Sequence, residues 1–264
     1  MRYGSIEWLE HQFVPLNRYL GDRWGHRWRG SQKLRFEVTA KVLRERLRSR
    51  SRQKILDIGC GMGDFTKIIF NYNETNKITA VDISQNALIN FIPTSKSKVK
   101  LVRAALPNLD FPENTFDGIV ALEVVCYLSD IERELSFKNM HRILKPGGWI
   151  LFSSVVEKKR TRYFTVEDAI TLFQRYFDTE FIGFHYSAIF SKIERIPFGA
   201  FNKFAELSKR LKNNMMSPLI IAPAVLLYLI LSQKWIAKFM VEISKFIFGP
   251  ENTRSHIILL GTKK

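Results

Sequence analysis

Short runs of branched apolar residues alternate with amphipathic segments over most of the chain. Runs at 54–58, 77–81, 99–103, 116–124, 149–155 and 181–186 have the length and composition of strands, and a last run follows at 255–260. Segments between them, such as 65–70, 130–144 and 166–177, repeat apolar residues at helical spacing. This alternation predicts an α/β fold with a doubly wound, mostly parallel sheet of seven strands.

The first strand ends in a glycine-rich turn that leads directly into a helix. Gly59, Gly61 and Gly63 occupy this turn. Glycine permits positive φ and lets a ligand lie against bare backbone, while the helix start presents N–H groups that the helix itself cannot satisfy. The second strand ends in Asp82, whose carboxylate could accept both hydroxyls of a ribose. An Asp at a strand end can also cap the next helix, so both roles stay open for Asp82.

The glycine spacing separates two kinds of ribose-bearing cofactor. A nicotinamide dinucleotide site has the pattern G-x-G-x-x-G, which disfavours an NAD-dependent oxidoreductase here. This chain instead has Gly59-x-Gly61-x-Gly63, with Asp57 two residues before the first glycine. That pattern resembles motif I of the class I S-adenosylmethionine-dependent methyltransferases.

Two later runs resemble the same family. Residues 116–124 are similar to its fourth strand, and residues 144–151 to its turn into the fifth, so the resemblance covers residues 54–155. It implies a Rossmann-like methyltransferase fold, methyltransferase activity and S-adenosyl-L-methionine as the cofactor. Here the sixth and seventh strands are separated by a helical insertion, whereas family members usually join them by a short hairpin.

The resemblance also implies where the cofactor is held. The positions concerned are Asp57, Gly59, Cys60, Gly61, Gly63, Asp82, Ile83, Leu106 and Glu123. Family members usually have an Asp after the third strand that contacts the adenine amino group, and this chain has Ala104-Ala105-Leu106-Pro107 at that place. Adenine recognition is therefore expected to depend on the Leu106 backbone and on apolar packing.

Four residues are candidates for a catalytic base. Glu123 and Tyr127 follow the fourth strand, so both are expected at the ligand-binding edge of the sheet, and His185 belongs to the sixth strand. His26 lies in an aromatic and basic segment that either packs on the sheet or covers the cofactor or acceptor. A base is needed only if the nucleophile holds a poorly acidic proton, as a sugar or phenol hydroxyl does. None of the four is favoured over the others.

Charge and composition bear on location and partners. The chain has 264 residues, a formal net charge of +16 and two cysteines, Cys60 and Cys126. Such a charge first suggests nucleic acid, but the sequence has no zinc-ligand spacing, no recognition-helix pattern and no Asn/Asp-Pro-Pro-Tyr/Phe motif, so neither nucleic acid nor a metal is expected. The few cysteines and the lack of an apolar signal-peptide core predict a cytoplasmic protein.

The domain organisation is expected to have three parts. These are an N-terminal helical cap over 1–53, a methyltransferase core over 54–188 and 255–264, and a helical insertion over 189–254.

Residues 215–233 contain no charge and are just long enough to span a bilayer, but one crossing would separate the last strand from its sheet. Residues 235–248 predict an amphipathic helix of interfacial type, with an apolar arc formed by Ile236, Phe239, Met240, Ile243 and Ile247.

The insertion is open to three interpretations. It is a membrane-docking element through residues 205–248, a lid over an apolar acceptor pocket, or a buried helical cap or dimer face; we favour the first two together over the third. We therefore predict methyl transfer to an O-, N- or C-nucleophile of a hydrophobic or lipid-linked small molecule, at the inner face of a membrane. The alternatives are methyl transfer to a soluble sugar or amino-sugar, and a non-catalytic membrane-associated scaffold with a vestigial cofactor site.

Overall fold

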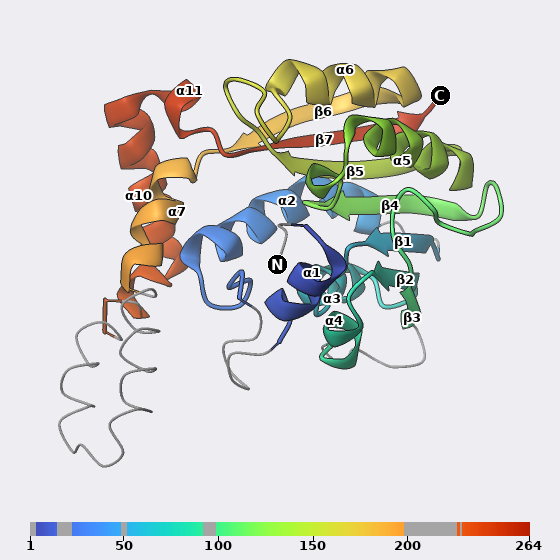
Figure 1. Ribbon diagram of the computed structural model, residues 1–264, viewed down its shortest axis with the longest axis horizontal. Helices are drawn as coiled ribbons and strands as arrows, with labels where there is room; N and C mark the ends of the chain where they lie inside the picture. The colour runs from blue at the N-terminus through green and yellow to red at the C-terminus, as the bar shows by residue number, and fades with distance from the viewer. Residues whose placement is uncertain (1–3, 15–22, 49–51, 92–98, 198–225, 228) are drawn as a thin grey trace, which may run out of the picture. The chain divides into compact units, whose positions relative to one another are not determined.

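The computed structural model describes residues 4–14, 23–48, 52–91, 99–197, 226–227 and 229–264 (Figure 1). The chain divides into two compact units. The first comprises Met1–Gly25, Phe36–His185 and Ser255–Lys264, and the second comprises His26–Arg35 and Tyr186–Arg254. The three-part domain organisation expected from the sequence stays a prediction.

A seven-stranded sheet forms the centre of the first unit. Its strands are β1 (Lys54–Ile58), β2 (Lys77–Asp82), β3 (Val99–Arg103), β4 (Phe116–Leu122), β5 (Leu144–Val155), β6 (Phe177–His185) and β7 (His256–Lys263). They lie in the order β3-β2-β1-β4-β5-β7-β6, and β7 is antiparallel to β5 and β6 while the other neighbours are parallel. The predicted doubly wound, mostly parallel sheet of seven strands is confirmed. Its strand order reverses between β1 and β4, where open α/β sheets bind their ligands.

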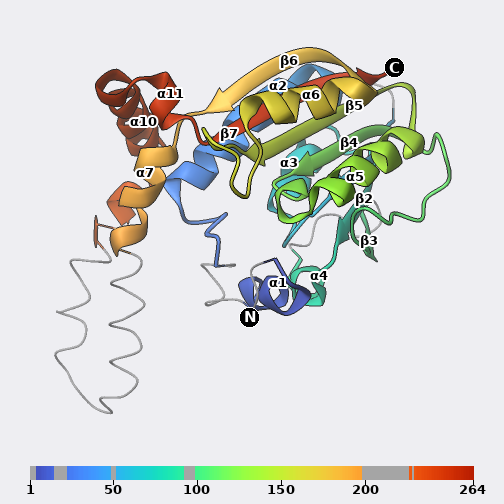
Figure 2. The same ribbon diagram turned by 45° about the horizontal axis from the view of Figure 1, so that its top comes forward.

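Helices cover both faces of this sheet (Figures 1 and 2). The helices are α1 (Ile6–Gln12), α2 (Gly30–Arg48), α3 (Asp64–Tyr72), α4 (Gln85–Ile89), α5 (Asp130–Ile143) and α6 (Val166–Tyr176), with a 3-10 turn η1 (Val125–Tyr127) after β4. On one face, Phe137 of α5 and Phe173 of α6 pack against Phe152 of β5. On the other face, Leu43 of α2 and Ile69 of α3 belong to a second buried cluster. Burial of these side chains on both faces is what allows the central strands to be largely apolar on both faces.

Side-chain caps set the starts of four of these helices, α1, α4, α5 and α6. Ser84 caps α4, and its hydroxyl accepts a hydrogen bond from the N–H of Ala87 at 3.1 Å. Thr165 caps α6 with a reciprocal bond to Asp168, and Ser129 caps α5 in the same way. The caps fix the residue at which each helix begins. They therefore also fix where the loop before each helix ends, at the edge of the sheet.

β6 begins at Phe177, earlier than the sequence indicates, and ends at His185. The first residues of β6 do not alternate regularly between apolar and polar. The pairing of β6 with β7 shifts register between Thr179 and Phe181, which accounts for this irregular pattern. Such an irregularity adds an unpaired residue and interrupts the period of two that identifies a strand.

The second unit contains the start of α2 up to Arg35, with α7 (Ala188–Ile193), α10 (Lys234–Phe248) and α11 (Pro250–Thr253). A buried ion pair lies within it, since Nε of Arg29 donates to Oε1 of Glu194 at 2.8 Å and both side chains are almost fully buried. Burial lowers the pKa of Arg29, and the charge of Glu194 acts against that shift. A Cβ on Gly30 would lie 2.5 Å from the carbonyl oxygen of Leu231, so this helix start approaches the backbone too closely for any other residue.

The amphipathic helix predicted over residues 235–248 is present as α10. Most of the uncharged stretch 215–233 lies outside the described residues, so its expected placement stays a prediction. Within the described ranges, no helix has both the length and the apolar character needed to cross a membrane.

Candidate functional site

The glycine turn after β1 is bound to the end of β2. Gly59, Gly61 and Gly63 have φ values of +68°, +55° and +85°, in the left-handed region that favours glycine. The N–H groups of Gly59 and Cys60 donate to the carbonyl oxygen of Val81, at 2.7 and 3.0 Å. The turn therefore lies across the carboxyl ends of two neighbouring parallel strands.

Close packing also leaves no room for a side chain at two of these glycines. A Cβ on Gly59 would lie 1.8 Å from Cγ1 of Val124, and one on Gly61 would lie 3.1 Å from the ring of Phe13. The sequence argument for Gly61 assigned that space to a ligand, and the structure places Phe13 against it. Val124 follows β4, so its contact with Gly59 joins the turn to the segment across the switch point between β1 and β4.

Asp82, at the end of β2, holds two backbone segments. Its Oδ2 accepts from the N–H of Gly61 at 2.8 Å, and its Oδ1 accepts from the N–H of Ser84 at 2.9 Å. Burial raises the pKa of Asp82, and these two bonds act in the opposite direction. A carboxylate offers about four lone-pair positions, so the structural role shown here and a bond to ribose hydroxyls are compatible.

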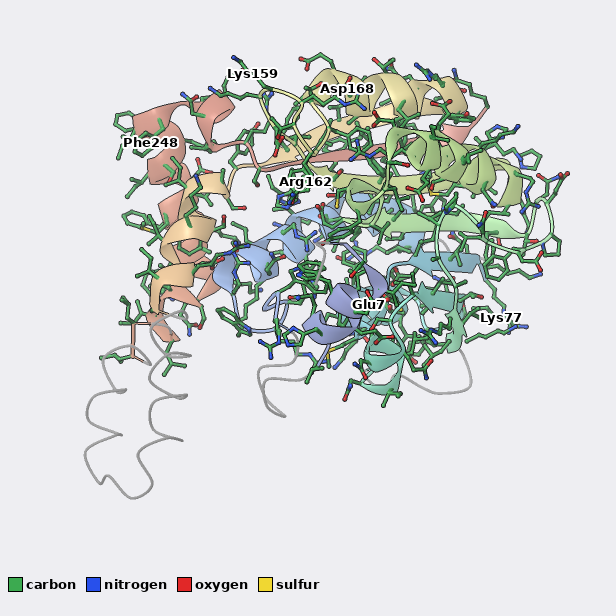
Figure 3. The ribbon with its side chains drawn as sticks, in the orientation of Figure 1. Glu7, Lys77, Lys159, Arg162, Asp168 and Phe248 are labelled. Atoms are coloured by element: carbon green, nitrogen blue, oxygen red, sulfur yellow. The ribbon has the colours of Figure 1, made fainter. Side chains whose placement is uncertain are left out.

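Helix α1 covers the segment that follows Asp82 (Figure 3, in which Glu7 marks this helix). The carboxylate of Glu10 accepts from the hydroxyl of Ser84 at 2.7 Å and from the N–H groups of Gln85 and Asn86 at 2.8 and 2.9 Å. Burial acts to raise the pKa of Glu10, but these bonds and the nearby Arg103 outweigh it and the pKa is lowered. The N-terminal segment is therefore fixed to the same edge as the glycine turn.

A second buried carboxyl group lies below the turn. Asp57 of β1 is 3% exposed, and the hydroxyl of Thr66 donates to its Oδ2 at 2.5 Å. Burial raises the pKa of Asp57 to about 7, and the charge of Asp82 adds to the shift. Burial also raises the pKa of the Cys60 thiol well above its usual value. Two buried carboxyl groups close to each other make this end of the sheet favourable for a cation.

Glu123 follows β4 with a left-handed backbone, at φ +59°. Its N–H donates to the carbonyl oxygen of Ser153 at 2.9 Å. Its Oε1 accepts from the Ser153 hydroxyl at 2.7 Å and its Oε2 from the N–H of Val155 at 2.9 Å. A non-glycine residue adopts this conformation only where its surroundings impose it, and here three bonds to β5 do so.

The other catalytic candidates lie in different places. Tyr127 ends η1, and its ring centroid is 6.1 Å from that of Trp8 in α1. His185 ends β6 and is buried, with Nε2 3.1 Å from the hydroxyl oxygen of Thr39. His26 belongs to the second compact unit, where it is half-buried. The catalytic roles of all four candidates stay predictions.

Two expected cofactor residues lie near the ends of β2 and β3. Ile83 is half-buried, and its carbonyl oxygen accepts from Nε of Arg103 at 3.0 Å. Leu106 is half-buried and packs against the main core cluster. The structure thus brings the expected positions of the turn, the end of β2 and the end of β4 to one edge, while their contact with a cofactor stays a prediction.

The sequence candidates did not include His256, which lies at this edge. It begins β7, and its Nε2 is 3.6 Å from Oε2 of Glu123. Because β7 is antiparallel to β5, its first residue lies beside the carboxyl end of β5, at Val155. Family members usually join the last two strands by a hairpin, which makes the last strand antiparallel, and this was the signal that could have identified this histidine.

Comparison with known proteins agrees with the geometry. A family described as "Methyltransferase domain" matches residues 56–152. The chain carries a class I S-adenosylmethionine-dependent methyltransferase domain. The cofactor of this class is S-adenosylmethionine, so the predicted fold, family and cofactor are confirmed.

Curated relatives of this domain carry names of different activities. A demethylmenaquinone methyltransferase of Staphylococcus aureus is 34% identical over 122 residues, which are 42% of this chain and 48% of that protein. The mitochondrial arginine-hydroxylase NDUFAF5 of Rattus norvegicus is 39% identical over 93 residues, which are 35% of this chain and 26% of that protein. The chain therefore covers less than half the length of these curated relatives.

A solved structure shows the fold of the methyltransferase domain with a relevant ligand. The N-methyltransferase NodS of Bradyrhizobium japonicum WM9, in complex with S-adenosyl-l-homocysteine, superposes with a TM-score of 0.54 at 21% identity. The match covers 68% of this chain and 89% of NodS.

The raised pKa of Asp57 predicts a specific pH dependence of stability. Between about pH 4 and pH 7, the unfolded chain loses the Asp57 proton while the folded protein keeps it, so this group lowers the free energy of unfolding as pH rises. A shift from 3.8 to about 7 corresponds to at most about 4 kcal/mol. In the ligand-free protein, Asp57→Asn should therefore be more stabilising, relative to wild type, at pH 8 than at pH 5.

Denaturant unfolding of both proteins at the two pH values measures this difference. Asp110→Asn, in an exposed loop, is the matched control and should show no such dependence. Equal effects of Asp57→Asn at pH 5 and pH 8 would contradict the raised pKa.

Proposed function

We propose that the protein transfers the methyl group of S-adenosylmethionine to a hydrophobic or lipid-linked small molecule, and that it does so while docked on a membrane surface. The observation that carries the second part is an exposed aromatic face on α10. Methyl transfer is supported by the methyltransferase domain and by the arrangement of its carboxylates.

The residues of the glycine turn fit this cofactor. S-adenosylmethionine supplies a methyl group on a sulfonium, and it also has an ammonium group and two ribose hydroxyls. Asp82, which already orders the turn through Gly61, has acceptor positions for the ribose hydroxyls. Asp57 and Asp82 are buried carboxyl groups that a bound cation would stabilise in the ionised form. Positioning then supplies most of the catalysis.

Helix α10 turns large aromatic residues outward. Trp235, Phe239 and Phe246 are 69%, 61% and 92% exposed. Their spacing of four and seven residues places them on one stripe of the helix, which we call the aromatic stripe. Ile247 and Phe248 add further exposed apolar surface at the end of the helix.

The opposite face of α10 is the one that packs within its own unit. Ala237, Val241 and Ser244 are buried there, and they are smaller than the residues of the stripe. Of the apolar arc expected from the sequence, Phe239 and Ile247 are exposed, and the other three residues are half-buried. A helix that buries small residues and exposes aromatic ones has the character of an interfacial helix.

Charge complements this apolar surface. Lys234 and Lys238 are exposed on the same helix, and the chain has a formal net charge of +16. Each basic residue near an anionic bilayer contributes about 1 kcal/mol to binding, and buried aromatic side chains add a part that salt does not screen. An anionic membrane surface therefore suits α10, and it would bring a lipid-linked acceptor to the enzyme.

Cofactor binding tests the first part of the proposal. Asp82→Asn removes the charge but keeps one carbonyl oxygen, and it should weaken the binding of S-adenosylhomocysteine by about 1.5–3 kcal/mol, the worth of charged hydrogen bonds. Isothermal titration calorimetry measures the affinity, and Asp110→Asn should leave it unchanged. If Asp82→Asn binds as tightly as wild type while its unfolding temperature is also unchanged, Asp82 does not hold the ribose.

Flotation with anionic liposomes tests the second part. Wild type should float, and the triple variant Trp235→Ser, Phe239→Ser, Phe246→Ser should partition at least about tenfold less, because it loses apolar burial at the interface. Added salt should weaken wild-type binding only partly.

The control for flotation removes exposed apolar residues elsewhere. Ile131→Ser with Phe181→Ser changes residues that are 75% and 41% exposed in the first unit, and this variant should float like wild type. Undiminished flotation of the triple variant would exclude the aromatic stripe as the docking surface. Absence of flotation by wild type would favour the buried cap or dimer face.

A further inference from the structure

A chain of polar side chains crosses the carboxyl edge of the sheet from β4 to β6. His256 lies in the middle of it, paired in register with Val155 of β5 and with His185 of β6. Its Nε2 is 3.6 Å from Oε2 of Glu123, and its ring centroid is 6.0 Å from that of His185. The side chains of Glu123 and His256 are each 16% exposed, so the pair is largely shielded from water.

Contacts around Ser255 favour one tautomer of His256. The Ser255 hydroxyl is 3.0 Å from the carbonyl oxygen of His185, and it can form that bond only by donating its hydrogen. The same hydroxyl oxygen is 2.9 Å from Nδ1 of His256, and while its hydrogen is donated to His185 it can only accept from Nδ1–H. This arrangement favours the Nδ1–H tautomer of neutral His256, in which the lone pair of Nε2 lies on the side of the Glu123 carboxylate.

Glu123 is held in place to serve such a partner. Its two carboxylate oxygens accept from the Ser153 hydroxyl and the Val155 N–H, and its backbone is fixed in a left-handed conformation. A strained conformation of a non-glycine residue is found most often where function requires it. A proton taken up at Nε2 would create an imidazolium next to a fixed negative charge, which stabilises it.

The pair lies next to the cofactor turn through a direct contact. Val124, the residue after Glu123, occupies the space that a Cβ on Gly59 would need. The chain of contacts therefore runs from Gly59 through Val124 and Glu123 to His256. Ligands of open α/β sheets bind at this edge, beyond the ends of the strands on either side of the switch point.

We propose that His256 is the proton acceptor of the methyl transfer, that Glu123 positions it and stabilises its cation, and that the acceptor is a molecule whose nucleophilic atom holds a proton, such as a hydroxyl group. This inference depends on the proposed function. The acceptor atom supplies the electron pair of the new bond to the methyl carbon, the pair of the broken carbon–sulfur bond stays on sulfur, and the acceptor's proton goes to Nε2 of His256. A nucleophile without a proton, such as a tertiary amine, would have no use for this pair.

Nuclear magnetic resonance of the full-length protein with ¹⁵N-labelled histidine tests the proton-accepting pair without any acceptor. The titratable groups that face His256 are Glu123, after β4, and His185, in β6. Neutral His256 should be the Nδ1–H tautomer, and Glu123→Gln should lower the midpoint of its titration by about one pH unit or more. His256→Asn assigns the signal. Glu113→Gln, in an exposed turn before β4, is the matched control and should not move the midpoint.

Two ligands then test whether His256 faces the reacting atoms. Sinefungin has an ammonium group where S-adenosylmethionine has its sulfonium methyl, whereas S-adenosylhomocysteine is uncharged there. Sinefungin should therefore lower the titration midpoint of His256 further than S-adenosylhomocysteine does. The midpoint of His141, which is half-buried near the end of α5 and packs against Tyr176 and Phe177, should respond equally to both.

The outcomes separate this inference from the proposed function. If calorimetry shows that neither ligand binds, the proposed function fails, while the effect of Glu123→Gln is still decided in the ligand-free protein. If both ligands bind and move the His256 midpoint equally, His256 does not face the methyl group and the inference is overturned. An Nε2–H tautomer, or a midpoint that Glu123→Gln does not change, overturns it as well.

Discussion

The buried carboxylate of Asp82 connects the parts of the proposed cofactor site. One oxygen binds the N–H of Gly61 in the glycine turn, and the other binds the N–H of Ser84 at the start of α4. Ser84 also donates to Glu10, and this bond fixes α1 to the same edge. A carboxylate desolvated to this degree is costly unless backbone donors satisfy it, so the geometry of the turn and the placement of α1 depend on the same group.

The proposed proton-accepting pair lies across the switch point between β1 and β4. There the left-handed residue Glu123 is bound to β5, and the antiparallel β7 adds His256 beside it. The packing of Val124 on Gly59 joins this pair to the glycine turn. The fold thus brings the glycine turn and Asp82 close to Glu123 and His256, although Asp82 and His256 are far apart in the sequence.

Local signals were sufficient to predict the sheet and the glycine turn, because apolar period and glycine spacing act over a few residues. His256 was missed because its position depends on the pairing of β7 with strands about 100 residues earlier in the sequence. The sequence left the direction of Phe239 open, because a membrane-docking helix exposes this residue and a buried cap covers it. Both faces of α10 are apolar in part, and only packing decides that the face with Ala237 is the buried one.

Hydrogen–deuterium exchange with and without S-adenosylhomocysteine tests most directly whether the glycine turn and Asp82 form the cofactor site. The full-length protein should exchange more slowly with the ligand in peptides that cover residues 59–66 and 82–90, because the ligand closes the turn and fixes α4. Peptides from α10 should not change. Slower exchange confined to α10, or unchanged exchange at 59–66 and 82–90 at a ligand concentration that saturates binding by calorimetry, would contradict this assignment of the site.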